Sequence, residues 1–242
     1  MATQLPPTPP NTDVLSGLTG LKFAQAWWQW LSSVGQAIVS MLASITSIQA
    51  GLPFRGVQVF LASGTFTPGA GVNKVFAEVW AGGGGSGGTN AGTTNGAGGG
   101  GGGYANGILA VTPGVGVTAT VGGGGGGGVA GGGGGTGGTS SFGSITCFGG
   151  NPSPGATGGI AGGTGGGASG GDVNITGAAG GQNNYSNAGA VLTSGAGGTA
   201  YGGPATAGAN GGGYFPGGGG MGQVSANSIG FPGAQGMIVV RW

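Results

Sequence analysis

The chain has 242 residues, of which 73 are glycine and 3% are charged, and its formal net charge is +1. So few charges cannot form a basic surface for nucleic acid or anionic lipid, so we expect neither partner. With no histidine and a single cysteine, Cys147, the sequence excludes a histidine-based catalytic triad, an intrachain disulfide and a cysteine metal cluster, and it predicts no cofactor and no metal site.

Residues 1–20 are rich in proline, threonine and glycine. This composition predicts an extended anchoring arm that can lie in a groove of a larger partner, and a frayed tail is the alternative. The opening MATQLPPTPP lacks a basic region followed by an apolar run. We therefore expect no signal peptide, and assembly in a cytoplasm.

Residues 21–50 carry the pattern of an oligomerisation or attachment helix. Apolar residues recur at alternating spacings of four and three, an a/d heptad pattern. The seam positions are Trp27, Leu31, Val34, Ile38, Met41, Ile45 and Ile48. No charge occurs between Lys22 and Arg55, so a membrane span is the rival interpretation. The four glutamines and five serines in between favour self-association or a partner-facing helix, without membrane insertion.

Three large rings, Trp27, Trp28 and Trp30, lie within four residues, too many for one seam. We expect one or two of them to face another surface. That surface is either the particle into which the helix plugs or residues 52–60 of the same assembly.

Strand patterns bracket the glycine-rich stretch. Period-two alternation and apolar runs mark residues 56–68, 72–80, 108–121 and 237–242, with a turn at 67–71. The last of these, MIVVRW, is apolar enough to predict a strand paired inside a sheet. All but eight of the glycines lie between Ala81 and Gly236, so the bracketing favours a folded head domain over residues 51–242.

Glycine runs such as 98–103, 122–128 and 131–135 suit polyproline-II geometry, whose N–H and C=O groups point outward. Without side chains, such helices can pack side by side and satisfy one another's backbone groups. Collagen is excluded because no strict G-X-Y period is kept. Matches to GxGxxG arise by chance in this composition, and no GK[ST] follows any run.

The string GTFTPGAGVNKVFAEVWAGGGGSGG resembles the opening of the glycine-rich domain of bacteriophage tail-fibre and virion-fibre proteins. The matching residues are Thr65, Phe66, Pro68, Gly71, Val72, Val75, Val79, Trp80, Ala81 and Gly82. Segments 109–125, 137–144 and 236–242 also match, so the resemblance covers about residues 60–242. Two departures are Ala81, where the family usually has glycine, and the spacing of the first turn.

The resemblance implies a mostly β fold with polyglycine or polyproline-II helices, a homotrimer and a non-enzymatic virion fibre or adhesin. Residues 1–50 would attach to other virion proteins, and the head would face a bacterial polysaccharide or outer-membrane protein. Asparagine and aromatic residues in the loops suit such recognition. The candidate contacts are Asn183, Asn184, Tyr185, Asn187, Tyr201, Tyr214 and Phe215. The alternative is that the aromatic ones only cover the glycine array.

The residues also bear on three other functions. A depolymerase needs paired carboxylates, and only Asp13, Glu78 and Asp172 are acidic, with Glu78 placed to pair with Lys74. An ice-binding protein would need an evenly repeated Gly-x-x pattern, which the irregular runs do not keep. A capsid-bound head fibre or a tail-nozzle component without a receptor role shares every feature of the adhesin.

Overall fold

The computed structural model describes residues 20–50, 54–91, 95–155, 161–183, 194–204 and 211–242. It divides into one compact unit up to Pro53 and a second from Phe54 onward. Over these described residues the chain is mostly β: one N-terminal helix is followed by two five-stranded antiparallel sheets. The mostly β prediction is thus confirmed, while the predicted arm, up to residue 19, lies outside the described residues.

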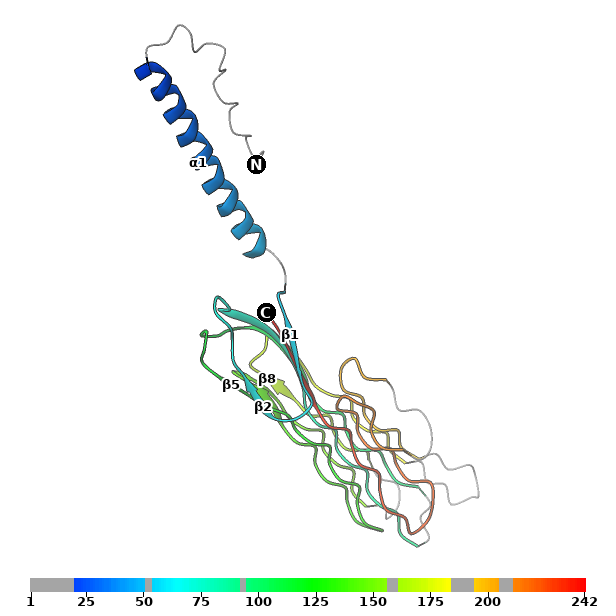
Figure 1. The fold of residues 1–242 in the computed structure, drawn as a ribbon. Coiled ribbons are helices and arrows are strands. Elements are labelled where there is room, and N and C mark those ends of the chain that lie inside the picture. Colours follow the sequence, from blue (N-terminus) through cyan, green and yellow to red (C-terminus); the bar gives the residue numbers. More distant parts are fainter. Residues whose placement is uncertain (1–19, 51–53, 92–94, 156–160, 184–193, 205–210) are drawn as a thin grey trace. The chain divides into compact units, whose positions relative to one another are not determined.

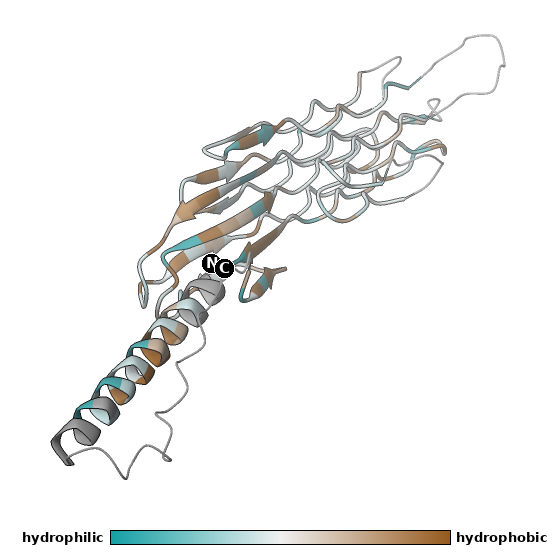
Figure 2. Ribbon diagram, turned by 90° about the horizontal axis from the view of Figure 1, so that it is seen from above, coloured by the Kyte–Doolittle hydropathy of each residue, from teal (hydrophilic) through white to brown (hydrophobic). Residues whose placement is uncertain are grey.

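Helix α1, Gly20–Ala50, confirms the helix predicted over 21–50. Figure 2 shows apolar residues along one side of it. The seam residues Leu31, Ile38 and Met41 are each about half exposed, because a single helix offers them nothing to pack against. The Trp27 and Trp30 rings meet edge to face with centroids 5.4 Å apart, whereas Trp28 is 72% exposed. The side chains of Ile45 and Ile48 lie outside the described set.

Serine hydroxyls on α1 donate back to carbonyls one turn earlier. Ser40 donates to the carbonyl of Gln36 at 2.9 Å, and Ser44 to that of Ser40 at 2.9 Å. These bonds satisfy polar side chains on the helix itself. Within the described part of the chain, no helix combines the length and apolarity needed to cross a bilayer.

The first sheet of the second unit has the strand order β1-β10-β3-β4-β9. Its strands are β1 Val57–Phe60, β10 Met237–Arg241, β3 Lys74–Trp80, β4 Tyr104–Ala110 and β9 Val173–Ile175. Strand β10 pairs with β1 on one side and β3 on the other, which confirms the prediction of a C-terminal strand inside a sheet. The backbone of Gly56 exchanges bonds of 2.9 and 3.1 Å with Trp242, so the unit begins and ends at one place.

The second sheet has the order β2-β5-β6-β7-β8. Its strands are β2 Gly64–Phe66, β5 Val117–Thr120, β6 Ser140–Phe142, β7 Ile145–Cys147 and β8 Ala168–Ser169. A two-residue turn joins β6 to β7, and its first residue, Gly143, has φ 57°, in the left-handed region that favours glycine.

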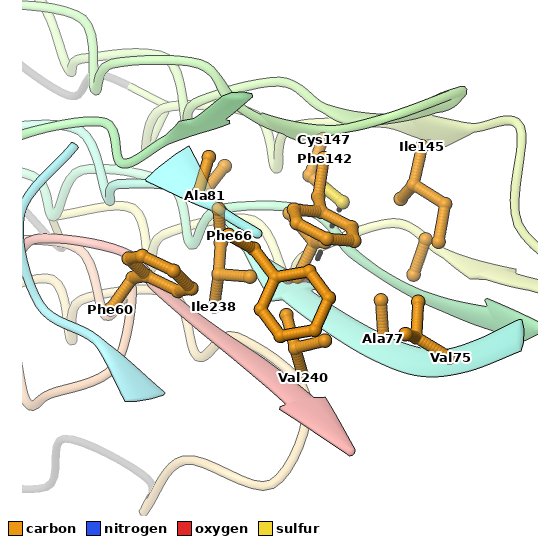
Figure 3. Close-up of a cluster of buried hydrophobic side chains, with 13 residues drawn as sticks. Phe60, Phe66, Val75, Ala77, Ala81, Phe142, Ile145, Cys147, Ile238 and Val240 are labelled. Atoms are coloured by element: carbon orange, nitrogen blue, oxygen red, sulfur yellow. Dashed lines mark hydrogen bonds between the residues drawn. The ribbon is translucent and has the colours of Figure 1, made fainter. Parts of the chain in front are cut away.

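The hydrophobic core lies between the two sheets (Figure 3). Phe66 is central: its ring centroid lies 6.0 Å from that of Phe142 and 5.1 Å from that of Trp242. Cys147 is fully buried there and donates from Sγ to the carbonyl of Val79 at 3.2 Å. Burial raises the pKa of this thiol to about 12, so it fills space as a neutral group.

Two predicted strands are each broken in two. Residues 56–68 form β1 and β2 in different sheets, because the bend at 61–63 lets both Phe60 and Phe66 enter the core from opposite layers. Residues 108–121 likewise supply the end of β4 and all of β5, with Gly114 at φ 78° between them.

The glycine-rich segments leave the strands and run side by side toward the other end of this unit (Figure 1). We call them the glycine array. Its described segments are residues 81–89, 95–103, 122–138, 148–155, 161–167, 176–183, 194–200, 211–223 and 228–236. Among the described segments, residues 122–128 run away from the sheets, turn at 129–131 and return as 132–138.

Candidate functional site

The first central segment of the array, residues 81–89, is fully buried and bonds to its neighbours with a period of three. Gly82, Gly85 and Gly88 donate to the carbonyls of Gly138, Gly135 and Gly132 at 3.0, 2.9 and 2.9 Å. The next residue in each triplet turns to a different segment: Gly83, Ser86 and Thr89 donate to Ala234, Phe231 and Ser228, each at 2.9 Å. The remaining residues of the triplets, where they donate to a backbone carbonyl, do so to the segment 100–103.

The second central segment, residues 96–103, repeats this pattern. Gly96, Gly99 and Gly102 donate to the carbonyls of Gln223, Gly220 and Gly217 at 2.7, 2.8 and 2.8 Å. The intervening residues donate to Gly181 and Ala178 on one side and to Asn151 and Phe148 on another. In every direction, three steps forward on this segment correspond to three steps backward on its antiparallel neighbour.

The carbonyls of the same two segments accept bonds from further neighbours. Segment 81–89 accepts from Gly150, Gly125 and Gly220, at 2.9 Å each. Segment 96–103 accepts from Gly163, Gly198 and Gly84 at 2.9, 2.8 and 2.8 Å. Each buried segment is thus enclosed on all sides, and its backbone groups are satisfied by other segments rather than by water.

Close approach explains why these positions are glycine. A Cβ atom at Gly84 would overlap the carbonyl oxygen of Asn151, and one at Gly100 would overlap that of Thr164. On the outer segment 122–128 every third position is open: a Cβ at Gly125 would overlap the carbonyl oxygen of Gly135, whereas one at Gly123 or Gly126 would meet nothing within 4 Å.

The end of the array remote from the sheets holds most of the buried polar side chains. They are Ser86, Thr89, Asn95, Ser153, Asn183 and Gln223. Thr89 illustrates their role: its hydroxyl donates to the carbonyl of Ser225 and accepts from the backbone of Ser228 at 3.0 Å. Ser153 accepts from the backbone of Gly87 at 2.8 Å and donates to the carbonyl of Ala97 at 2.7 Å. The hydroxyls of Thr89 and Ser153 thus complete the backbone bonding where the period-three pattern stops.

The predicted receptor-contact residues fall at two places. Asn183 is 5% exposed at the remote end, where its Nδ2 donates to the carbonyl of Asn95 at 2.9 Å. Asn184, Tyr185 and Asn187 lie outside the described residues.

Tyr201, Tyr214 and Phe215 lie at the sheet end instead. The carbonyl of Tyr201 accepts from Nε1 of Trp80 at 2.9 Å, and Gly217, two residues after Phe215, accepts from Gly102 at 2.8 Å just before β4. All three side chains are about half exposed. The four predicted contact residues that the structure describes are therefore not brought together into one cluster.

A layer of aromatic and charged groups lies on part of one face of the first sheet, next to the glycine array, and sequence reasoning missed it. Trp80 and Tyr104 are cross-strand partners with ring centroids 4.7 Å apart, and Tyr201 stacks on Tyr104 at 4.6 Å. The Tyr104 hydroxyl donates to Glu78 Oε1 at 3.0 Å and accepts from Asn106 at 2.8 Å. Burial chiefly raises the pKa of Tyr104 to about 12.

Glu78 pairs with Arg241, the cross-strand diagonal neighbour on β10, rather than with Lys74 as predicted. On an antiparallel sheet Lys74 shares a face with Glu78 but lies four residues away along the strand, whereas Arg241 is on the adjacent strand. Asp172 accepts from the backbone of Ile108 at 2.8 Å. It lies beside Gly107, on the face opposite to Glu78, so the two carboxylates do not face one another.

No cluster of three or more potential metal-ligating side chains occurs among the described residues. No model of a known protein family matches the sequence, and no curated protein matches it either. The candidate site therefore rests on geometry alone: an end of the array at which turns gather, separated by the array from the sheets.

Proposed function

We propose that the chain is a bacteriophage virion fibre. In this proposal the N-terminal segment attaches to other virion proteins, and the glycine-rich head is presented to a polysaccharide or outer-membrane protein of a bacterial surface. The chain assembles as a homotrimer in the host cytoplasm and ends on the virion, and it acts without catalysis. The resemblance over residues 60–242 supports a place on a virion, because several sequence elements match those of phage fibre domains in the same order. Similar composition alone would not produce that order.

We also propose that the array segments are polyglycine-II-type helices. Such a helix has three residues per turn and no internal hydrogen bonds, so consecutive residues point in three directions. The period-three donation from Gly82, Gly85 and Gly88 to one segment, and from their successors to another, fits that geometry. So does the burial of every third residue at Gly122, Gly125 and Gly128.

One observation carries the proposal: the two ends of the head domain lie at the sheets, and several of its turns lie at the opposite end of the glycine array. Backbone bonds between Gly56 and Trp242 hold both ends of the head at the sheets, while the turns around Asn90, Ala130 and Ala226 lie beyond the array. Eight residues of polyproline-II geometry span about 25 Å. A rigid spacer of this kind presents variable turns outward while the attached end stays constant.

Electron microscopy of assembled particles tests the proposal, with a tag placed after Trp242. Density at the tip of the tail apparatus is the expected result, and exchange of residues 182–194 should then alter the host range without removing the fibre. Density on the capsid shell or inside a ring of tail proteins would favour the alternative, a head fibre or nozzle component without a receptor role. Absence of the chain from any particle would overturn the virion proposal.

A second candidate, ice binding, is favoured by one specific observation. The outer segments around Thr136, Asn151 and Thr164 lie in a row, because Gly137 donates to Gly150 and Asn151 donates to Thr164, both at 2.9 Å. All three side chains are exposed at the same level of the array. A freezing-hysteresis measurement on the purified chain decides this: no hysteresis removes the candidate.

A further inference from the structure

The outer face of the first sheet is only half covered. Pairing places Trp80, Tyr104 and Ile175 in one row across it, and this row is covered by Ala200 and Tyr201. The next two rows, farther from the glycine array, lack that cover except at Val239, which is 7% exposed and packs in the same cluster as Trp80 and Ala200. They consist of Val59, Val239, Glu78, Asn106 and Val173, and of Val57, Arg241, Phe76 and Ile108.

The uncovered rows expose large apolar side chains. Ile108 is 63% exposed, Val57 60% and Val59 50%. Phe54, whose ring lies 6.3 Å from that of Phe76, is also about half exposed. Neighbouring apolar side chains on one face, rather than scattered single ones, mark an interaction surface.

The polar groups within these rows are already paired. Glu78 is bound by both Arg241 and the Tyr104 hydroxyl, and Asn106 donates to that hydroxyl. Within these two rows the charges of Glu78 and Arg241 sum to zero, and the exposed Lys74, one row farther out on the same face, adds a positive charge only at its edge. Arg241 also lies over the Phe76 ring, with 6.0 Å between its Cζ and the ring centroid. The face is therefore apolar with an internally neutralised centre, as the core of a protein interface is.

The chain itself indicates what covers the face. Only residues 51–53 separate the end of α1 from Phe54. Three residues span at most about 11 Å when fully extended. Helices that associate along the exposed seam of Leu31, Ile38 and Met41 would therefore bring the β1 strands of different copies close together.

We propose that the outer face of the first sheet, formed by Val57, Val59, Phe76 and Ile108, packs against a second copy of this chain. This inference rests on the proposed homotrimer and extends it, because the sheets and not the helix alone would hold the copies together. It assigns the exposed apolar residues of β1 and β4 a partner of known chemistry.

Site-specific photo-crosslinking in the full chain tests the inference. A benzophenone amino acid at Ile108 should yield covalent adducts of two copies, while the same probe at Val129, 72% exposed in a turn at the remote end, should yield none. A chain that sediments as an oligomer but gives no adduct from Ile108 would overturn the inference. That result leaves the virion proposal standing, since the location of the fibre on a particle is a separate readout.

A pair of charge substitutions provides the second measurement. Val59→Asp should weaken self-association by about tenfold or more, since a charge would enter the interface core, whereas Val129→Asp should change it less than about twofold. Circular dichroism and the unfolding midpoint would report whether each variant folds. Unchanged association of a folded Val59→Asp chain would show that the helix alone holds the copies together, and would also overturn the inference.

Discussion

Tyr201 stacks on Tyr104 with ring centroids 4.6 Å apart and planes inclined by 22°. The two residues come from distant parts of the sequence, one opening β4 and the other in a turn between array segments. This contact gives Tyr201 a structural role. From the sequence, a structural role and receptor contact were both open for this residue.

Replacing Tyr201 with alanine should lower the free energy of unfolding by about 1–2 kcal/mol, because the stacking and the cover over Tyr104 are lost. Tyr214 is equally exposed but makes no ring contact among those that the structure describes, so Tyr214→Ala should cost less than about 0.5 kcal/mol. Denaturant unfolding of both variants measures the difference. Equal losses would show that the stack contributes nothing to stability.

Adjacent glycines on the outer segment of the array offer a sharper test. Gly125→Ala places a methyl group on the carbonyl oxygen of Gly135, so the variant should lose about 1–3 kcal/mol. Gly126→Ala meets open space and should gain about 0.4–1 kcal/mol by restricting the unfolded chain.

Thermal unfolding of these two variants side by side gives the comparison. The opposite signs follow from one step along the same segment, so neither composition nor position in the fold explains them. If both substitutions destabilise equally, the close packing described for this segment is wrong.

Alkaline pH should destabilise the fold. The pKa of Tyr104 rises from 10.0 to about 12 on folding, so this residue stays protonated in the native state while it ionises in the unfolded chain. Its contribution is fully present below pH 10 and is lost as the pH rises toward 12. Cys147, raised from 9.0 to about 12, acts in the same direction from a lower pH.

The unfolding midpoint should therefore fall between pH 9 and 12, following the shifts of both groups. Tyr104→Phe should reduce that fall between pH 10 and 12, at the cost of the hydrogen bonds to Glu78 and Asn106 at neutral pH. Tyr214→Phe is the control, since its side chain is half exposed. An identical pH profile for Tyr104→Phe and the parent chain would contradict this assignment.

Two neighbouring positions on the helix provide a matched pair of substitutions that tests the proposed homotrimer. Ile38 is on the a/d seam and Val39, 66% exposed, is next to it but off the seam. In the proposed homotrimer, Ile38→Asp should weaken self-association by about tenfold or more, whereas Val39→Asp should change it less than about twofold. Sedimentation velocity on the full chain separates these outcomes, and a trimeric Ile38→Asp chain would exclude the seam as the contact.

Much of the fold was predictable because local patterns determine it. The 3-4 spacing of apolar residues gives α1, and the apolar run before Trp242 gives a strand between two others. The break between β1 and β2 was not predictable, because Phe60 and Phe66 keep the same alternation although they enter the core from different sheets.

The candidate site was less predictable than the fold. Loop composition selected Asn183 and Tyr201 alike, yet one is buried at the remote end of the array and the other lies on the sheet. Their separation depends on where each excursion of the chain begins and turns. Tyr104 could have been noticed as the residue at which a glycine run passes into a strand pattern, but its partners come from β3 and from the turn at residue 201.

Three residues forward along one array segment correspond to three residues backward along its antiparallel neighbour, and this register has an evolutionary consequence. An arm of the array that lost one residue would rotate every later N–H toward the wrong neighbour, whereas loss of three would keep the directions and shorten the arm by about 9 Å. Insertions and deletions inside the arms should therefore survive in multiples of three. Between the arms, beyond Thr89 or Val129, a turn is free of that rule, and length there can vary one codon at a time.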